Sequence, residues 1–204
     1  MIGVGLAVIL AFSPLTGTGT RTISAESTPQ ELLQACRQMM PRTVEIKGHI
    51  NRRSRHGIEV AAYRYVYTRQ NGEVRLTVMD KDGQVLELKP EGRLLDTDVT
   101  WSDLTLDYLD WEDVSNSPEG EMESIQTVKC RVLDLKKGSR LVRVWIDCRT
   151  GALMQAEEWQ EGKVIRRLFG TSIRKFGDRW APRTIEVGRP GAKYRTKIVV
   201  DELK

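Results

Sequence analysis

The sequence predicts a mainly β (α+β) fold, a curved antiparallel meander of about ten strands with helices packed against one face. Apolar and polar residues alternate with a period of two over most of the chain after residue 43. Turns rich in Gly, Asn and Asp separate the alternating segments, and only two segments have helical signals. Short loops between neighbours require antiparallel pairing, and so many strands in one domain must curl into a barrel, half-barrel or sandwich.

The N-terminal residues have the features of a signal peptide, which divides the chain into a signal peptide, 1–25, and one mature domain, 26–204. Residues 2–12 form an uncharged apolar run of 11 residues, too short to span a bilayer but typical of the hydrophobic region of a signal peptide. Ile23-Ser24-Ala25 provides a cleavage site. The alternative is a buried N-terminal strand, which Pro14 would interrupt. We therefore expect export to the periplasm.

Residues 28–40 carry the signals of a short amphipathic helix. Thr28 and Glu31 have the spacing of a capping box, and Pro29 takes the first helical position, where proline is tolerated. The apolar residues that follow recur at helical spacing until Pro41: Leu32, Leu33, Cys36, Met39 and Met40. A helix of this length is marginal alone, so we expect its apolar face to cover the sheet.

The strand signals run from residue 43 to the end of the chain with one interruption. Asn71-Gly72 is a strong signal for a tight hairpin turn, and Lys81-Asp82-Gly83 indicates another. The interruption is a central helical segment, 103–109, for which Ser102 can act as the N-cap. Six strands are expected in the last 80 residues: 125–135, 141–148, 152–160, 163–175, 179–188 and 194–203.

Charge is distributed unevenly, although the net charge is only +4. Ten acidic residues and no Lys or Arg lie between residues 94 and 128, whereas Arg52, Arg53, Arg55 and His56 form a basic cluster. A basic surface can attract nucleic acid or anionic lipid headgroups, but no nucleic-acid-binding module is recognisable. The acidic stretch, 96–123, is interpreted either as a solvated face or as a docking surface for a partner.

No motif for catalysis, metal binding or cofactor binding stands out. The chain lacks HExxH, the P-loop, GxGxxG and GxSxG, and no Cys/His pair has zinc spacing. A Ser-His-Asp arrangement with His49 or His56 is compatible with the composition, as it is in any chain with two histidines and many aspartates. The acids of the 96–123 stretch lack the glycine and ligand spacing of a calcium loop. We therefore expect no catalytic residue, metal or cofactor.

Cys130 and Cys148 flank a predicted hairpin turn near Gly138. A three-residue loop, 138–140, would place the two cysteines directly opposite each other, within disulfide range. Other loop lengths shift the register by about one to three residues. In an oxidising compartment such a pair is expected to form a disulfide, and the alternative is two buried free thiols. Cys36 would remain reduced.

A series of short motifs succeeds one another at hairpin spacing. They are Thr100-Trp101-Ser102-Asp103-Leu104, Val142-Arg143-Val144-Trp145-Ile146-Asp147, Thr150-Gly151-Ala152-Leu153, Glu158-Trp159, Gly162-Lys163-Val164-Ile165-Arg166 and Trp180-Ala181-Pro182-Arg183-Thr184-Ile185. With these motifs, residues 44–204 resemble the bacterial outer membrane lipoprotein-sorting protein family, the relatives of the LolA and LolB carriers. The resemblance implies an incomplete β-barrel whose concave apolar face is covered by the N-terminal helix and the short central helix. It also implies binding of acyl chains without chemistry.

The expected pocket lies on this concave face and is lined by strand residues of one parity, which the sequence leaves open. The residues proposed to line it are Leu32, Leu33, Met39, Met40, Trp101, Leu104 and Trp145, with Trp101 and Leu104 at its mouth. Core packing is the alternative role for each of them.

The function expected from these features is a periplasmic, non-catalytic carrier or binder of a lipid or an acylated lipoprotein. Membrane-associated donor or acceptor proteins are possible partners, and we expect a monomer. The alternative is an envelope stress sensor or interaction domain of the same fold, which would dock its partner through the acidic 96–123 surface.

Overall fold

The structure, a computed structural model, describes residues 13–14, 26–54, 56–57, 59–70, 73–89, 92–94 and 97–204. The strands are β1 (Ser13–Pro14), β2 (Thr43–Ser54), β3 (Glu59–Gln70), β4 (Glu73–Met79), β5 (Val85–Leu86), β6 (Asp113–Asn116), β7 (Met122–Ile125), β8 (Val128–Lys137), β9 (Arg140–Asp147), β10 (Leu153–Gln160), β11 (Lys163–Phe176), β12 (Arg179–Gly188) and β13 (Tyr194–Leu203). The helices are α1 (Pro29–Met39), α2 (Trp101–Thr105) and the 3₁₀ helix η1 (Asp107–Asp110).

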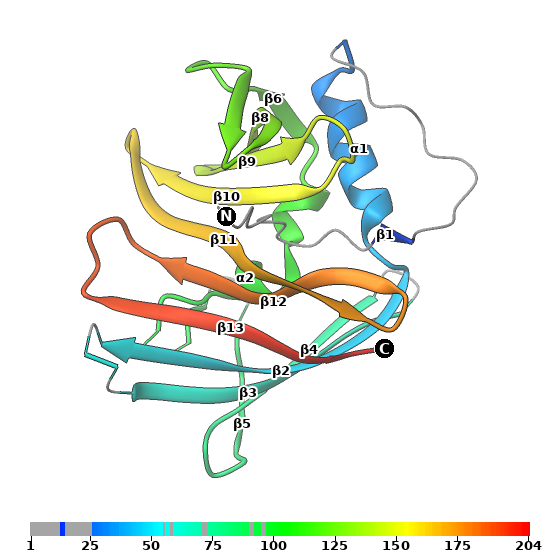
Figure 1. Ribbon diagram of the computed structural model, residues 1–204. Helices are drawn as coiled ribbons and strands as arrows, with labels where there is room; N and C mark the ends of the chain where they lie inside the picture. Colours follow the sequence, from blue (N-terminus) through cyan, green and yellow to red (C-terminus); the bar gives the residue numbers. More distant parts are fainter. Residues whose placement is uncertain are drawn as a thin grey trace, which may run out of the picture.

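All described strands belong to one antiparallel sheet (Figure 1). The strand order is β5-β4-β3-β2-β13-β12-β11-β10-β9-β8-β6, while β1 pairs with β12 and β7 pairs with β8. The end strands β5 and β6 do not pair with each other in the described part of the chain, so the curved sheet remains open. The predicted mainly β fold, an incomplete antiparallel barrel, is confirmed.

Two-residue turns connect several of the hairpins. Glu161 and Gly162, between β10 and β11, both have positive φ, 51° and 73°. Positive φ at both central positions gives a turn whose twist matches that of the flanking strands. The hairpin spacing seen in the sequence therefore becomes direct pairing of neighbouring strands.

The pairing of β2 with β13 joins the two ends of the meander. Gly48 lies within this pair, where a Cβ atom would come within 2.0 Å of the Val199 carbonyl oxygen and 2.7 Å of the Tyr65 ring. The Tyr65 hydroxyl instead passes over the glycine and donates to that carbonyl, at 3.3 Å. Glycine is required here because the ring crosses directly over the backbone of β2.

Side-chain alternation decides which residues face the inside of the curved sheet. The main apolar core lies there and takes residues from strands along the whole sheet: Ile46, Ile50, Tyr65, Tyr67, Leu133, Leu135, Val142, Val144, Ile146, Leu168, Ile185, Val187, Ile198 and Val200. A second, smaller cluster comprises Cys130, Val132, Trp145, Ala152 and Met154. Trp145 alternates with Val144 and Ile146 of β9, so the second cluster lies on the convex face.

Helix α1 begins as predicted. Thr28 is its N-cap, the Glu31 N–H donates to the Thr28 hydroxyl at 3.2 Å, and the Thr28 N–H donates to the Glu31 carboxylate at 2.9 Å. The central helical segment differs from the prediction. Thr100, not Ser102, is its N-cap, and Leu106, with φ 54°, separates α2 from η1. No helix in the described part of the chain combines the length and apolar character needed to cross a bilayer.

The register of the β8–β9 hairpin corrects the predicted disulfide geometry. Cys130 lies opposite Asp147, not Cys148, because Gly138, with φ 59°, allows a turn of two residues where three were predicted. Cys148 therefore projects to the other face of the sheet. All three cysteines are free. Burial raises the pKa of the Cys36 and Cys130 thiols to about 12, which leaves both protonated and unreactive at neutral pH.

Several predictions concern residues outside the described ranges. The signal peptide, 1–25, is described only at Ser13–Pro14, which pairs with Trp180 and Arg179 of β12. The Asn71-Gly72 turn, Arg55 of the basic cluster and Asp96 of the acidic stretch also lie outside.

Candidate ligand-binding site beneath the central helices

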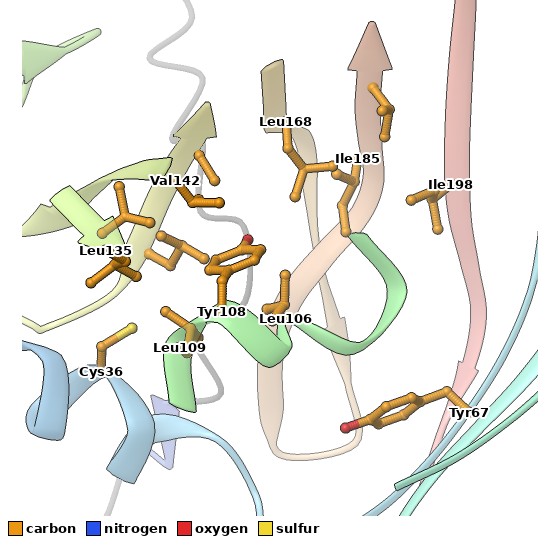
Figure 2. Close-up of a cluster of buried hydrophobic side chains, with 14 of the residues drawn as sticks. Cys36, Tyr67, Leu106, Tyr108, Leu109, Leu135, Val142, Leu168, Ile185 and Ile198 are labelled. Atoms are coloured by element: carbon orange, nitrogen blue, oxygen red, sulfur yellow. The ribbon is translucent and has the colours of Figure 1, made fainter. Parts of the chain in front are cut away.

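The concave face of the sheet is covered by residues 101–111, which comprise α2, Leu106, η1 and Trp111; we call this segment the lid. Figure 2 shows Leu106, Tyr108 and Leu109 of the lid pointing into the space enclosed by the sheet. All three are about 2% exposed and belong to the main core. They face strand residues from both halves of the sheet, among them Leu135, Val142, Leu168, Ile185 and Ile198. The lid therefore occupies the position that an apolar ligand of this face would take.

Arg166 of β11 holds the start of the lid against the sheet. Its guanidinium donates to the Asp103 carboxylate at 2.5 Å and to the Thr100 hydroxyl at 2.6 Å, and on the other side to Glu158 of β10 at 2.7 Å. Burial raises the pKa of the Asp103 carboxyl, and Arg166 opposes this rise. The contact is thus a buried charge pair that bridges the lid and two strands.

Arg140 of β9 extends this network. Its guanidinium donates to the Ser102 hydroxyl at 3.2 Å, lies 3.6 Å from the Glu158 carboxylate and stacks 5.1 Å from the centre of the Trp111 ring. Two arginines on the sheet therefore share Glu158 and reach both ends of the lid. The positive charges of Arg140 and Arg166 are matched by the carboxylates of Asp103 and Glu158, so this network is electrically balanced.

Arg37 of α1 holds the other end of the lid through backbone groups. Its guanidinium donates to the carbonyl oxygen of Leu109 and, at 2.9 Å, to that of Trp111. These carbonyls terminate η1 and would otherwise lack partners within the helix. Helix α1 therefore contributes apolar residues to the core and a cation that ties down the lid.

The lid leaves a small cavity and unsatisfied polar atoms beneath it. A cavity of about 80 Å³ lies between the lid, the end of α1 and strands β3 and β4, with Met40, Arg69, Val74 and Trp101 in its wall. The hydroxyls of Tyr67 and Tyr108 are buried and have no hydrogen-bond partner among the described residues. Each such group costs about 1–3 kcal/mol. The lid therefore packs incompletely against the concave face and leaves two buried hydroxyls without hydrogen bonds among the described residues.

No family model matches the chain, and no curated protein matches it either. Solved structures do. A LolA superfamily protein from Nitrosomonas europaea matches with a TM-score of 0.67 at 16% identity, over 87% of this chain and 93% of its own. The chain has the LolA-like fold. A DUF1329 family protein from Desulfovibrio piger matches with a TM-score of 0.62 at 13% identity, over 87% of this chain and 93% of its own. A putative outer membrane lipoprotein-sorting protein domain from Vibrio parahaemolyticus matches with a TM-score of 0.60 at 10% identity, over 86% of this chain and 92% of its own.

The LolA-like architecture brings most of the proposed pocket residues to the concave side. Leu32 and Leu33 of α1 are buried in the main core, and Met40 and Leu104 pack against it. Trp101 lines the small cavity together with Met40.

Met39 and Trp145 lie elsewhere. Met39 packs against the second cluster, and Trp145 belongs to that cluster on the convex face, where its ring N–H donates to Glu123 at 2.9 Å. These two residues therefore do not lie beside the other five, and contact of any of the seven with a ligand stays a prediction. The three arginines that hold the lid were missed, because single arginines far apart in the sequence form no motif.

The acidic stretch is largely used inside the LolA-like domain. Six of its carboxylates meet a donor of the same chain: Asp98, Asp103, Asp110, Glu119, Glu121 and Glu123. Glu119 pairs with Arg143 at 2.6 Å, for example, although Arg143 also pairs with Asp134. Among the described residues, no group of three His, Cys, Asp or Glu side chains is arranged to hold a metal ion.

Proposed function

We propose that the protein is an exported, non-catalytic carrier or binder of an acylated ligand in the periplasm, and that the acyl chain displaces the lid from the concave face. The observation that carries this proposal is the lid itself. A continuous apolar face is covered by two short helical pieces, broken at Leu106 and held at their ends by three arginines. Such a segment can leave the sheet without unfolding any strand.

The free energies of burying the lid and of burying an acyl chain favour replacement of the lid by the acyl chain. Burial of Leu106 and of Leu109 contributes about 1.5–3 kcal/mol each, whereas an acyl chain gains about 0.8 kcal/mol for each buried methylene, or about 11 kcal/mol for a chain of about 14 carbons. Part of that gain is lost to the ordering of the chain. The unpartnered hydroxyls of Tyr67 and Tyr108 lower the cost of moving the lid.

The hydrogen bonds and ion pairs of Arg37, Arg140 and Arg166 with the lid, which we call the lid clamp, would hold the lid closed reversibly. When the lid is open, Arg166 keeps Glu158 on the neighbouring strand, and hydration of Arg166 and Asp103 replaces the ion pair that these two have lost. When the lid is closed, Arg166 returns to Asp103 and Thr100. The clamp therefore sets a defined closed position without making opening prohibitively costly.

Binding of a fluorescent fatty acid to the purified domain, 26–204, tests the carrier proposal. We expect saturable binding by the wild type and its loss in Leu168→Glu, which places a charge on the concave face. Ile165→Glu on the same strand is the matched control, because Ile165 is 37% exposed, and it should bind as the wild type does. Circular dichroism confirms folding of both variants. Absence of binding by the wild type would refute the proposal.

Two observations bear on the other parts of the proposal. Export is supported by the apolar run of residues 2–12 and the Ile23-Ser24-Ala25 site, and N-terminal sequencing of protein recovered from the periplasm should begin at Glu26. A sensor that docks its partner through the acidic stretch is less well supported, because six carboxylates of that stretch already have partners in the chain.

A further inference from the structure

A larger cavity lies at the end of the sheet where β2 ends and β13 begins. Its volume is about 650 Å³, and four cationic side chains line it: Arg52, Arg93, Arg189 and Lys193. Asp98 is the only carboxylate among the described lining residues, and it lies 3.2 Å from Arg189. The described lining residues therefore carry more positive than negative charge, which favours an anionic ligand.

This basic cavity adjoins the concave apolar face. Ile50 of β2 lies opposite Ile198 of β13, and both are buried in the main core. Arg52, two residues further along β2, lies opposite Thr196 and so projects from the same face. Leu94, a member of the main core, also lines the basic cavity. An acyl chain along the concave face would therefore place its polar end at these cations.

One of the cations in the cavity has a defined orientation. The guanidinium of Arg52 stacks over the Tyr194 ring, 4.5 Å from its centre, and this fixes the plane of the cation at the cavity.

We infer that the basic cavity binds the phosphate of a lipid headgroup while the acyl chain of the same lipid takes the place of the lid on the concave face. The inference rests on the proposed function and narrows its ligand to a phosphorylated, acylated amphiphile. Arginine suits this role, because its planar guanidinium can donate two parallel hydrogen bonds to one phosphate. Arg93 and Lys193 are exposed at the rim, where they can close on the headgroup.

Calorimetric titration with three ligands separates the contributions of chain and phosphate. Myristoyl glycerol phosphate carries both, monomyristoyl glycerol carries only the chain, and glycerol phosphate carries only the phosphate. We expect the first to bind at least tenfold more tightly than either of the others. Equal affinity for the two acylated ligands would overturn the headgroup site but leave the carrier proposal intact.

Two other outcomes are equally decisive. If neither acylated ligand binds, the carrier proposal fails and the inference fails with it. If glycerol phosphate binds as tightly as its acylated form, the cavity takes free phosphate compounds, and its assignment to a lipid headgroup is wrong.

A double variant tests whether Arg93 and Lys193 contact the phosphate of the headgroup. Arg93→Gln with Lys193→Gln should weaken binding of myristoyl glycerol phosphate about 25-fold, since each cation near an anionic lipid contributes about a factor of five, and should leave monomyristoyl glycerol unaffected. Lys175→Gln with Arg183→Gln removes the same charge from exposed positions outside the cavity lining and should change neither affinity. Equal losses in the two double variants would show a general effect of net charge and overturn the assignment.

Discussion

Arg166 is the residue on which the closed lid depends most. Its side chain is only 10% exposed and meets two carboxylates, of which Asp103 is 4% exposed. Removing a cation from such a buried pair leaves its partners desolvated and uncompensated, which is more costly than losing an ordinary surface ion pair.

Arg166→Gln should therefore destabilise the protein by about 3–5 kcal/mol, measured by urea unfolding. Arg183→Gln, at an exposed site on β12, should stay within about 0.5 kcal/mol of the wild type. The double variant Arg166→Met with Asp103→Leu should be more stable than Arg166→Gln, because no unpaired charge remains at Asp103. A loss below about 1 kcal/mol for Arg166→Gln would show that the clamp is not buried in solution.

Burial raises the pKa of the Asp103 carboxyl above its ordinary value of 3.8, and this gives the stability a predictable pH dependence. A carboxyl with a higher pKa in the folded state takes up protons on folding, so its stabilising contribution is complete below the ordinary value and is lost as pH rises through the folded pKa. The free energy of unfolding of the wild type relative to Asp103→Asn should therefore fall as pH rises from below 3.8. Urea unfolding of both proteins at matched pH checks this, and a difference that rises with pH would contradict it.

The cysteines should react in a fixed order. Cys36 and Cys130 are buried with pKa values raised to about 12, whereas Cys148 is only half-buried. We expect one thiol per molecule to react with a thiol reagent in the native protein and three after unfolding, counted by mass spectrometry. Cys148→Ser should remove the native reaction. A native protein with no reactive thiol and a mass lower by two hydrogens would instead indicate a disulfide.

At the scale of elements, the β2–β13 pair is the most constrained contact of the sheet. The position of Gly48 leaves no room for a Cβ, because the nearest neighbour is a backbone carbonyl that cannot turn away without breaking the pair. Strand alternation alone does not reveal this constraint, because it arises from the Tyr65 ring of the neighbouring strand β3 and from the Val199 carbonyl of β13, which is distant in the sequence.

Gly48→Ala should lower the free energy of unfolding by more than about 3 kcal/mol, because overpacking against backbone cannot be relieved by a rotamer change. Gly188→Ala is the matched control. No atom lies within 4 Å of its added Cβ, so we expect a change of less than about 1 kcal/mol. Chemical denaturation of the two variants measures both values. Similar stability for the two would mean that β2 and β13 are less closely paired in solution.

At the scale of the whole molecule, the lid and the sheet should differ in how they open. Amides of residues 101–111 are held by short helices and side-chain contacts, whereas β9 to β12 are paired on both sides. Hydrogen exchange measured by mass spectrometry should show faster exchange in the lid than in these strands. Arg166→Gln should accelerate the lid further and change the strands less. Equal protection of lid and strands would mean that the lid opens only when the protein unfolds.

Much of this architecture could be predicted from local patterns. The period-two alternation and the turns predicted the meander, and the Thr28 and Glu31 spacing predicted the start of α1. The β2–β13 pair could not be predicted, because residues about 150 positions apart carry no mutual signal in one sequence. The break at Leu106 was also missed, since a leucine with positive φ is imposed by tertiary packing.

The site was predictable only in part for a related reason. Apolar residues of the helices mark a buried face, but the sheet parity that faces them depends on how the sheet curls. The place of Trp145 on the convex face therefore could not be predicted, and Arg166, 63 residues from Asp103, could be recognised only in three dimensions.

The position of β13 has a consequence for the order in which the chain folds. The C-terminal strand, Tyr194–Leu203, lies in the interior of the sheet and joins β2 to β12. A nascent chain emerges N-terminus first, so the block formed by β2 to β5 and the block that begins at β6 have no strand between them until residues 194–203 have been synthesised. The long loop closure required is slow compared with hairpin formation. β13 is therefore the last of the described strands to be synthesised, and until it pairs with β2 and β12 the two blocks of the sheet are not joined.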